Sequence, residues 1–125
     1  MRFRIAAMVV SASSVLLTSG ITKAADHQPP AKVYRYHGKV VPAKVARAIE
    51  RHFGGRYTWQ AIKVSFCESG WRTTARNGQY LGLFQMGRWA RGRYGHGTTA
   101  DIQAKAASAL FRASGKDWSP WECKP

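Results

Sequence analysis

Residues 67–85 read CESGWRTTARNGQYLGLFQ, and the rest of the chain is organised around this stretch. Glu68 is the only acidic residue between Glu50 and Asp101. A helix is predicted to end beside it, because Ser69-Gly70 interrupts the helical spacing of the preceding apolar residues. The negative end of a helix dipole disfavours a carboxylate by about 0.3–1 kcal/mol and raises its pKa. Glu68 is therefore either an ordinary surface acid or a group that retains a proton near neutral pH.

Helical periodicity predicts two helices before this stretch. The first opens at Pro42 and stops at Gly54-Gly55, which suits the first-turn preference of proline and the terminal preference of glycine. Its apolar face consists of Val41, Val45, Ala48, Ile49 and Phe53. The second follows Thr58, a plausible N-cap, and carries Trp59, Ile62 and Phe66 on one face. Lys44, Arg47 and Arg51 form either a solvated side of the first helix or a basic binding face.

A hairpin and two helices are predicted to follow. Asn77-Gly78 is a strong tight-turn signal, and a third helix is expected from Gly82 to about Trp89. Residues 98–101 resemble a capping box in which Asp101 caps the fourth helix. Its expected apolar stripe is Ile102, Ala106, Ala109, Leu110 and Ala113. The pattern predicts a mainly α (α+β) fold with a minor hairpin.

The first residues have the layout of a secretory signal peptide, with Arg2 and Arg4 before an uncharged apolar run. We expect a signal peptide at 1–24, a linker or N-terminal arm at 25–40, and the functional domain at 41–125. A retained N-terminal anchor is the alternative. Cleavage would leave a secreted protein, expected to be monomeric, with no membrane association.

The charge is strongly positive, at +14 for 125 residues. Cleavage after Ala24 removes three basic residues and no acidic one, which leaves 17 basic against 6 acidic residues and a charge of +11. Such a balance favours an anionic partner. Export makes an anionic cell wall the expected partner and argues against nucleic acid, for which no recognised motif is present.

The two cysteines, Cys67 and Cys123, are expected to form a disulfide, because an even count is typical of small exported domains. Cys67 with His52 or His96 as a thiol protease pair is an alternative that the disulfide would remove. Neither a metal site nor a cofactor is expected. The four histidines are scattered, and phosphate-binding loops and Rossmann fingerprints are absent from the sequence.

Glycoside cleavage is the chemistry that suits these residues best. It requires a carboxylic acid that delivers a proton to the leaving oxygen, and flat groups that seat sugar rings. The candidates around Glu68 are Trp71, Tyr80, Gln85 and Trp89. Each has a plainer interpretation as a core, hairpin-packing or hydrogen-bonding residue. Few other carboxylates are available, so a single acid would act either with help from a 2-acetamido group of the sugar or through a carbocation-like intermediate that is trapped internally.

This chain resembles the lytic transglycosylase-like domain of resuscitation-promoting factors, in the lysozyme superfamily, from about Trp59 to Cys123. The resemblance is carried by Cys67-Glu68-Ser69-Gly70, Trp71, Asn77-Gly78-Gln79-Tyr80 and Gly82-Leu83-Phe84-Gln85. Those factors usually have two further residues between the glycine and the tryptophan. The segment between Gln85 and Trp89 is also shorter here, and Arg88 stands where a threonine is usual.

The resemblance implies a small lysozyme-like fold whose substrate is peptidoglycan, cut at the β-1,4 bond between N-acetylmuramic acid and N-acetylglucosamine. It makes Glu68 the catalytic acid of a lytic transglycosylase or a muramidase. It also implies substrate contacts for Gln85 and Gln103, and matches the Cys67–Cys123 bridge. An ordinary solvated helix residue is the plainer interpretation of Gln103. The rival function is a non-catalytic cationic protein that binds cell walls or acts as an antimicrobial.

Overall fold

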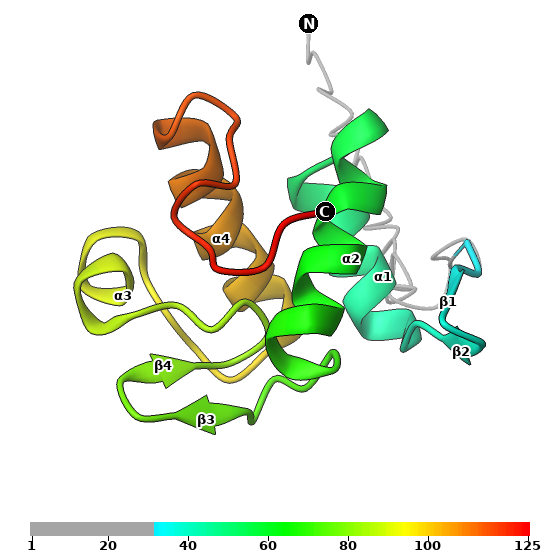
Figure 1. Ribbon diagram of the computed structural model, residues 1–125, viewed down its shortest axis with the longest axis horizontal. Helices are drawn as coiled ribbons and strands as arrows, with labels where there is room; N and C mark the ends of the chain where they lie inside the picture. Colours follow the sequence, from blue (N-terminus) through cyan, green and yellow to red (C-terminus); the bar gives the residue numbers. More distant parts are fainter. Residues whose placement is uncertain (1–31) are drawn as a thin grey trace, which may run out of the picture.

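The computed structural model describes residues 32–125. Within them the chain forms a small, mostly helical domain with two short hairpins (Figure 1). The helices are α1 (Ala43–His52), α2 (Gly55–Ser69), α3 (Arg88–Tyr94) and α4 (Ala100–Ala113). The strands are β1 (Arg35–Tyr36), β2 (Lys39–Val40), β3 (Arg76–Asn77) and β4 (Tyr80–Leu81). The expected signal peptide, and residues 25–31 of the expected arm, lie outside the described residues.

The core lies where α1 packs against α4 and α2. All five residues of the apolar face predicted for the first helix are buried. Phe53, at the end of that face, stacks on Phe84 and Trp118 with ring centroids 5.4 and 5.5 Å apart. Burying a side chain of this size contributes about 1.5–3 kcal/mol, so the α1 face anchors the domain.

α2 begins earlier than predicted. Thr58 is not its N-cap but a buried interior residue, and the N-cap is Gly54. Gly54 and Gly55 both have positive φ angles, of 70° and 50°. Glycine adopts these angles without a steric penalty, which lets the chain turn sharply from α1 straight into α2. The pair therefore starts the second helix as well as ending the first.

The third helix was predicted too early. Residues 82–87 form a tight turn, and α3 starts at Arg88, where that helix was expected to finish. Gly82 and Gln85 have positive φ angles, of 79° and 47°, which a right-handed helix does not accept. Leu81 and Met86 exchange backbone hydrogen bonds across the turn. The turn places Leu83 and Phe84 in the core, both fully buried.

α4 is capped by Thr99, whose hydroxyl accepts a hydrogen bond from the Ile102 amide at 3.2 Å. The expected capping role of Asp101 is wrong, because its carboxylate pairs with Arg51 and His52 of α1, at 2.8 and 2.9 Å. The predicted apolar stripe is also wrong in part, since Ile102 is 45% exposed. The buried face is instead Ala100, Gln103, Ala104, Ala106, Ala107, Ser108 and Phe111. Mostly small residues let α4 approach α1 closely.

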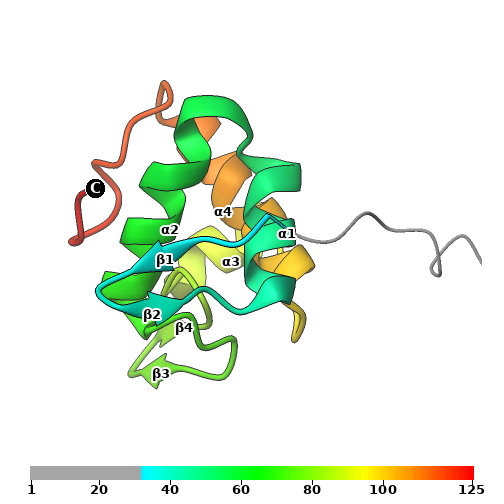
Figure 2. The ribbon, with the colours of Figure 1, turned by 90° about the vertical axis from the view of Figure 1, so that its right-hand side faces the viewer.

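Residues 35–40, expected to be part of a linker, form the antiparallel hairpin β1–β2. His37 and Gly38 make its turn with φ angles of 50° and 70°, as a two-residue hairpin turn requires. The hairpin lies over α2 (Figure 2), where the Tyr36 ring packs edge-on against Trp59 and Phe66. Sequence periodicity could not reveal so short an element, because each strand has two residues.

The C-terminal tail crosses between α4 and α2 (Figure 1) and is bonded to α2 by the Cys67–Cys123 disulfide, as predicted. Two side chains of the tail, Trp118 and Trp121, are buried in the core. Their indole nitrogens donate to Gln60 Oε1 and the Phe84 carbonyl, at 2.8 and 2.9 Å. The tail is therefore a packed part of the domain. Among the described residues, no helix is long and apolar enough to cross a membrane.

Candidate functional site

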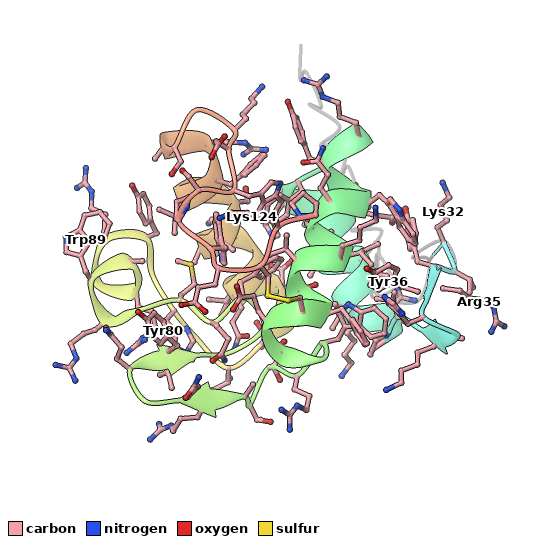
Figure 3. All side chains as sticks on the ribbon, viewed as in Figure 1. Lys32, Arg35, Tyr36, Tyr80, Trp89 and Lys124 are labelled. Atoms are coloured by element: carbon pink, nitrogen blue, oxygen red, sulfur yellow. A yellow bond between two sulfur atoms is a disulfide. The ribbon has the colours of Figure 1, made fainter. Side chains whose placement is uncertain are left out.

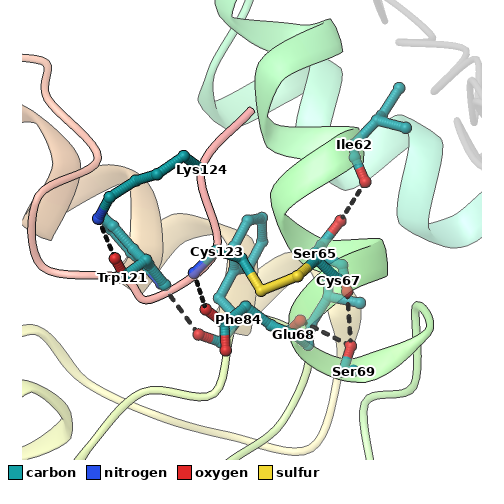
Figure 4. The surroundings of a disulfide bond; sticks show 10 residues. Ile62, Ser65, Cys67, Glu68, Ser69, Phe84, Trp121, Cys123 and Lys124 are labelled. Atoms are coloured by element: carbon teal, nitrogen blue, oxygen red, sulfur yellow. Dashed lines mark hydrogen bonds between the residues drawn. A yellow bond between two sulfur atoms is a disulfide. The ribbon is translucent and has the colours of Figure 1, made fainter.

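Glu68 lies in the last turn of α2, as the sequence predicted, and is half-buried. Gly70 ends the helix in the left-handed conformation, with φ 62° and ψ 34°. Ser69, between Glu68 and Gly70, is buried. Its hydroxyl donates to the Leu83 carbonyl at 2.7 Å and to the Ser65 carbonyl at 3.0 Å. These bonds tie the end of α2 to the following turn, and so fix the backbone that carries Glu68 (Figure 4).

The carboxylate of Glu68 accepts a hydrogen bond from the Cys123 amide at 3.1 Å, as Figure 4 shows. Burial raises the pKa of Glu68 above its ordinary value of 4.5. The Cys123 hydrogen bond and the Lys124 charge oppose this, while the Glu122 carboxylate adds to it. The direction agrees with the sequence expectation, but the main cause is desolvation and not the end of the helix.

A cavity opens beside this carboxyl group, and we call it the cleft. Its lining comes from α2, the β3–β4 hairpin, the turn after β4 and the tail. The lining residues are Glu68, Asn77, Tyr80, Gln85, Pro120, Trp121 and Glu122. A second hollow shares Tyr80, Gln85, Pro120 and Trp121 with the first and continues to Trp89. The two therefore form a groove that leads from Glu68 toward α3.

Gln85 combines two roles that the sequence left as alternatives. It lines the cleft, and its amide nitrogen donates to the carbonyls of Ala75 and Gly82, at 3.2 and 3.0 Å. These bonds hold Gln85 in its left-handed backbone conformation, with φ 47°. The residue thus braces the turn and forms part of the wall of the cleft.

The aromatic candidates separate into cleft and core residues. Tyr80 and Trp89 are 45% and 71% exposed, and both line the groove. Figure 3 labels the two side chains on the same side of the domain. Trp71 is buried, and its indole nitrogen donates to the Ile62 carbonyl at 3.0 Å. Trp71 is therefore a core residue, whereas Tyr80 and Trp89 are exposed aromatic residues that line the groove.

Gln103 lies away from the cleft and is only 3% exposed. Its amide oxygen accepts from the Leu83 amide at 2.7 Å. Its amide nitrogen donates to the carbonyls of Thr73 and Gly97, at 3.0 and 2.8 Å. Gln103 therefore joins three loops that converge on α4, which gives it a structural role. The substrate contact that the resemblance implies for it stays a prediction.

Replacing Gln103 with alanine is expected to lower the free energy of unfolding by about 2–4 kcal/mol, because one buried and two part-buried backbone groups would lose their partners. Chemical denaturation measures this change. The matched control is the exposed Lys105→Ala on the same helix, which should change stability by less than about 0.5 kcal/mol. A Gln103→Ala variant as stable as wild type would contradict this role.

Four cleft residues were not predicted as site residues. One is Asn77, which the sequence indicated only as part of a turn, and the other three belong to the tail: Pro120, Trp121 and Glu122. The tail reaches the cleft because the disulfide places Cys123 beside Glu68. The position of these residues directly before the second cysteine was the available signal. Glu122 in particular is a second carboxylate in the cleft, which the sequence treated only as a neighbour of the bridge.

Comparison with known proteins adds no assignment: no family model, curated protein or solved structure matches this chain. Within residues 32–125, no three His, Cys, Asp or Glu side chains gather closely enough to hold a metal ion. The chemistry of the cleft must therefore be argued from its own residues.

Proposed function

We propose that this chain is a secreted glycosidase that cuts the β-1,4 bond between N-acetylmuramic acid and N-acetylglucosamine in peptidoglycan. The observation that carries the proposal is the half-buried Glu68 with its raised pKa, held at the side of a groove lined by exposed aromatic rings. A glycosidic oxygen must be protonated as it leaves, and a carboxyl group whose pKa is raised by burial is suited to this step. The domain would be lysozyme-like.

The proposed reaction uses Glu68 twice. Its carboxyl group first donates a proton to the bridging oxygen as the bond to the anomeric carbon breaks. The resulting carboxylate then draws a proton from the hydroxyl that attacks the anomeric carbon. Attack by the O6 hydroxyl of the same muramic acid gives a 1,6-anhydro sugar, and attack by water gives a reducing end. The sugar's own 2-acetamido group would stabilise the positive charge between the steps.

Two observations support the substrate class. Tyr80 and Trp89 offer flat exposed surfaces along the groove, which suit the faces of sugar rings. The resemblance of residues 59–123 to the transglycosylase-like domain of resuscitation-promoting factors points to the same polymer. A non-catalytic cationic protein remains the second candidate function, because the charge is +14 for the whole chain.

Release of soluble muropeptides from purified peptidoglycan tests the proposal. We expect release, with mass spectrometry assigning anhydro or reducing ends to the fragments. Sedimentation with wall material at low and high salt, measured in parallel, separates the two candidate functions. Salt-sensitive binding without any soluble fragment would replace the enzyme with the cationic binding protein.

The pH dependence of release is expected to report the protonation of Glu68. Only the protonated acid can donate, so release should fall as the pH rises through the Glu68 pKa, which lies above 4.5. The Glu122 carboxylate raises that pKa, and Glu122→Gln should therefore move the fall in release to lower pH. Asp117→Asn removes a fully exposed tail acid outside the cleft lining and is the matched control. Identical profiles for both variants would contradict this coupling.

A further inference from the structure

The β1–β2 hairpin carries a group of cations on a part of the molecule that the proposed reaction does not use. Lys32, Arg35 and Lys39 are all exposed. Lys63, on α2, lies between Trp59 and Phe66 on the helix face that the hairpin covers, because it is four residues from one and three from the other. We call these four residues the hairpin cations.

Within residues 32–125, no carboxylate forms an ion pair with this group. No acidic residue occurs between Asp26 and Glu50, or between Glu50 and Glu68. The Glu50 carboxylate is already engaged, because it accepts a hydrogen bond from the Tyr34 hydroxyl at 2.5 Å. Burial and this contact raise the pKa of Tyr34 to about 12, so the hydroxyl remains a donor at physiological pH. The hairpin therefore presents a local excess of positive charge.

Aromatic rings support the cations from beneath. Lys32 Nζ lies 5.5 Å from the Tyr34 ring centroid, and Lys39 Nζ lies 5.7 Å from that of Phe66. Both distances are within the range in which an ammonium group is attracted to the face of a ring. The Tyr34 and Tyr36 rings in turn pack on Trp59, which remains 38% exposed. The cations are thus held over a packed aromatic layer.

The hairpin cations and the cleft lie on different sides of the domain. Figure 3 places Lys32 and Arg35 at one side, and Tyr80 and Trp89 at the opposite side. The Glu122 carboxylate, which lines the cleft, would repel an anionic polymer from that groove. A polyanion would accordingly be attracted to the hairpin and leave the cleft open.

We propose that the β1–β2 hairpin binds a phosphodiester-linked polyol polymer, a linear anion with one negative charge per repeat. Its phosphates would pair with the hairpin cations, and its polyol units would lie against the exposed part of Trp59. The hairpin tip, His37-Gly38, has no apolar side chain, but Val33 and Val40 beside it are exposed, so the vesicle measurement described below separates a lipid surface from the polymer. This site is separate from the proposed catalytic function and does not depend on it.

The test measures the dissociation constant of the full chain for a glycerol phosphate oligomer at low and high salt. We expect binding that weakens with salt, since exposed charges are screened. The variant Lys32→Gln/Arg35→Gln/Lys39→Gln should bind roughly tenfold or more weakly, by analogy with the effect of removing basic residues near anionic surfaces. The control Arg76→Gln/Arg93→Gln/Lys105→Gln removes the same charge from exposed positions outside the hairpin and should change binding by less than about threefold.

Further variants keep the test decisive. Lys32→Arg/Arg35→Lys/Lys39→Arg preserves the charge and should bind like wild type. Arg35→Gln alone, next to exposed Val40 in the ladder, should weaken binding even if the triple variant melts early. Equal losses in the hairpin and control triple variants would overturn the site. Tighter binding to an oligonucleotide of equal charge, or to anionic phospholipid vesicles, would overturn the polyol polymer as the ligand.

Discussion

Replacing Glu68 with glutamine is expected to lower the rate of muropeptide release by about 10²–10⁴-fold, because a positioned general acid contributes on that order and glutamine has no proton to donate. The substitution is nearly isosteric. Its amide oxygen can still accept the Cys123 hydrogen bond that the carboxylate accepts at 3.1 Å. The loss should therefore appear in the rate of release and leave the folded structure intact.

The stability of this variant gives an independent readout with a definite sign. The folded protein holds the Glu68 proton more tightly than the unfolded chain, since burial raises the pKa above 4.5. Wild type should accordingly lose stability, relative to Glu68→Gln, as the pH rises from 4.5 through the folded-state pKa. Denaturation at several pH values measures this difference. At neutral pH the glutamine variant should be at least as stable as wild type.

The second carboxylate of the cleft provides the matched control for the rate. Glu122→Gln removes the same charge from the same cavity, but from an exposed side chain of the tail. Under acidic conditions, where Glu68 is protonated in both proteins, its release should remain close to wild type. Undiminished release by Glu68→Gln would remove Glu68 as the acid, and a large acidic-pH loss in Glu122→Gln would make the reaction one of two carboxylates.

The sequence predicted those parts of the fold that follow from helical spacing. The buried face of α1 appears as an apolar repeat, and Gly70 marks the end of α2 beside Glu68. The disulfide followed from the cysteine count. The helix predictions are correct because they depend on residues within a few turns of one another. The disulfide prediction is correct because two cysteines can pair in only one way.

The errors arise where distant contacts determine the local structure. Asp101 matched a capping pattern, yet Arg51 and His52 of α1 draw its carboxylate away. Glutamine in a helix is usually solvated. Gln103 is instead buried, and its amide bonds to three backbone groups of neighbouring loops. Residues 82–87 have glycines only at their two ends, Gly82 and Gly87, and the Leu81–Met86 backbone pair makes the segment between them a turn. No local pattern contains these partners.

The candidate site was predicted in its centre and missed along one wall. Glu68, Tyr80, Gln85 and Trp89 all line the groove, because they lie near one another in the sequence. Pro120, Trp121 and Glu122 reach the same groove across the disulfide from a tail that has no regular secondary structure. The predicted disulfide joins Cys67, the residue before Glu68, to Cys123. It therefore also implied that the residues just before Cys123 lie near Glu68.

Reduction of the Cys67–Cys123 disulfide is expected to lower the free energy of unfolding by about 4 kcal/mol, the loop-closure contribution for cysteines 56 residues apart. For a domain of this size, such a loss corresponds to a fall in Tm of roughly 15–30 °C. Release should also fall at temperatures where the reduced protein is still folded. The Cys123 amide and three lining residues would then be held only by the packing of Trp118 and Trp121.

A thermal melt with and without a thiol reductant measures the effect, and the variant Cys67→Ser/Cys123→Ser supplies the control. The variant should melt at the temperature of reduced wild type, and the reductant should not move its Tm. An unchanged wild-type Tm on complete reduction would show that the tail is held by its tryptophans alone. The two measurements report different properties. The Tm reports how much the disulfide stabilises the fold. Release from the reduced but folded protein reports whether the tail still places the Cys123 amide against Glu68. A large fall in Tm with full release below the melt would therefore keep the bridge as a stabilising element and reject it as a support for the cleft.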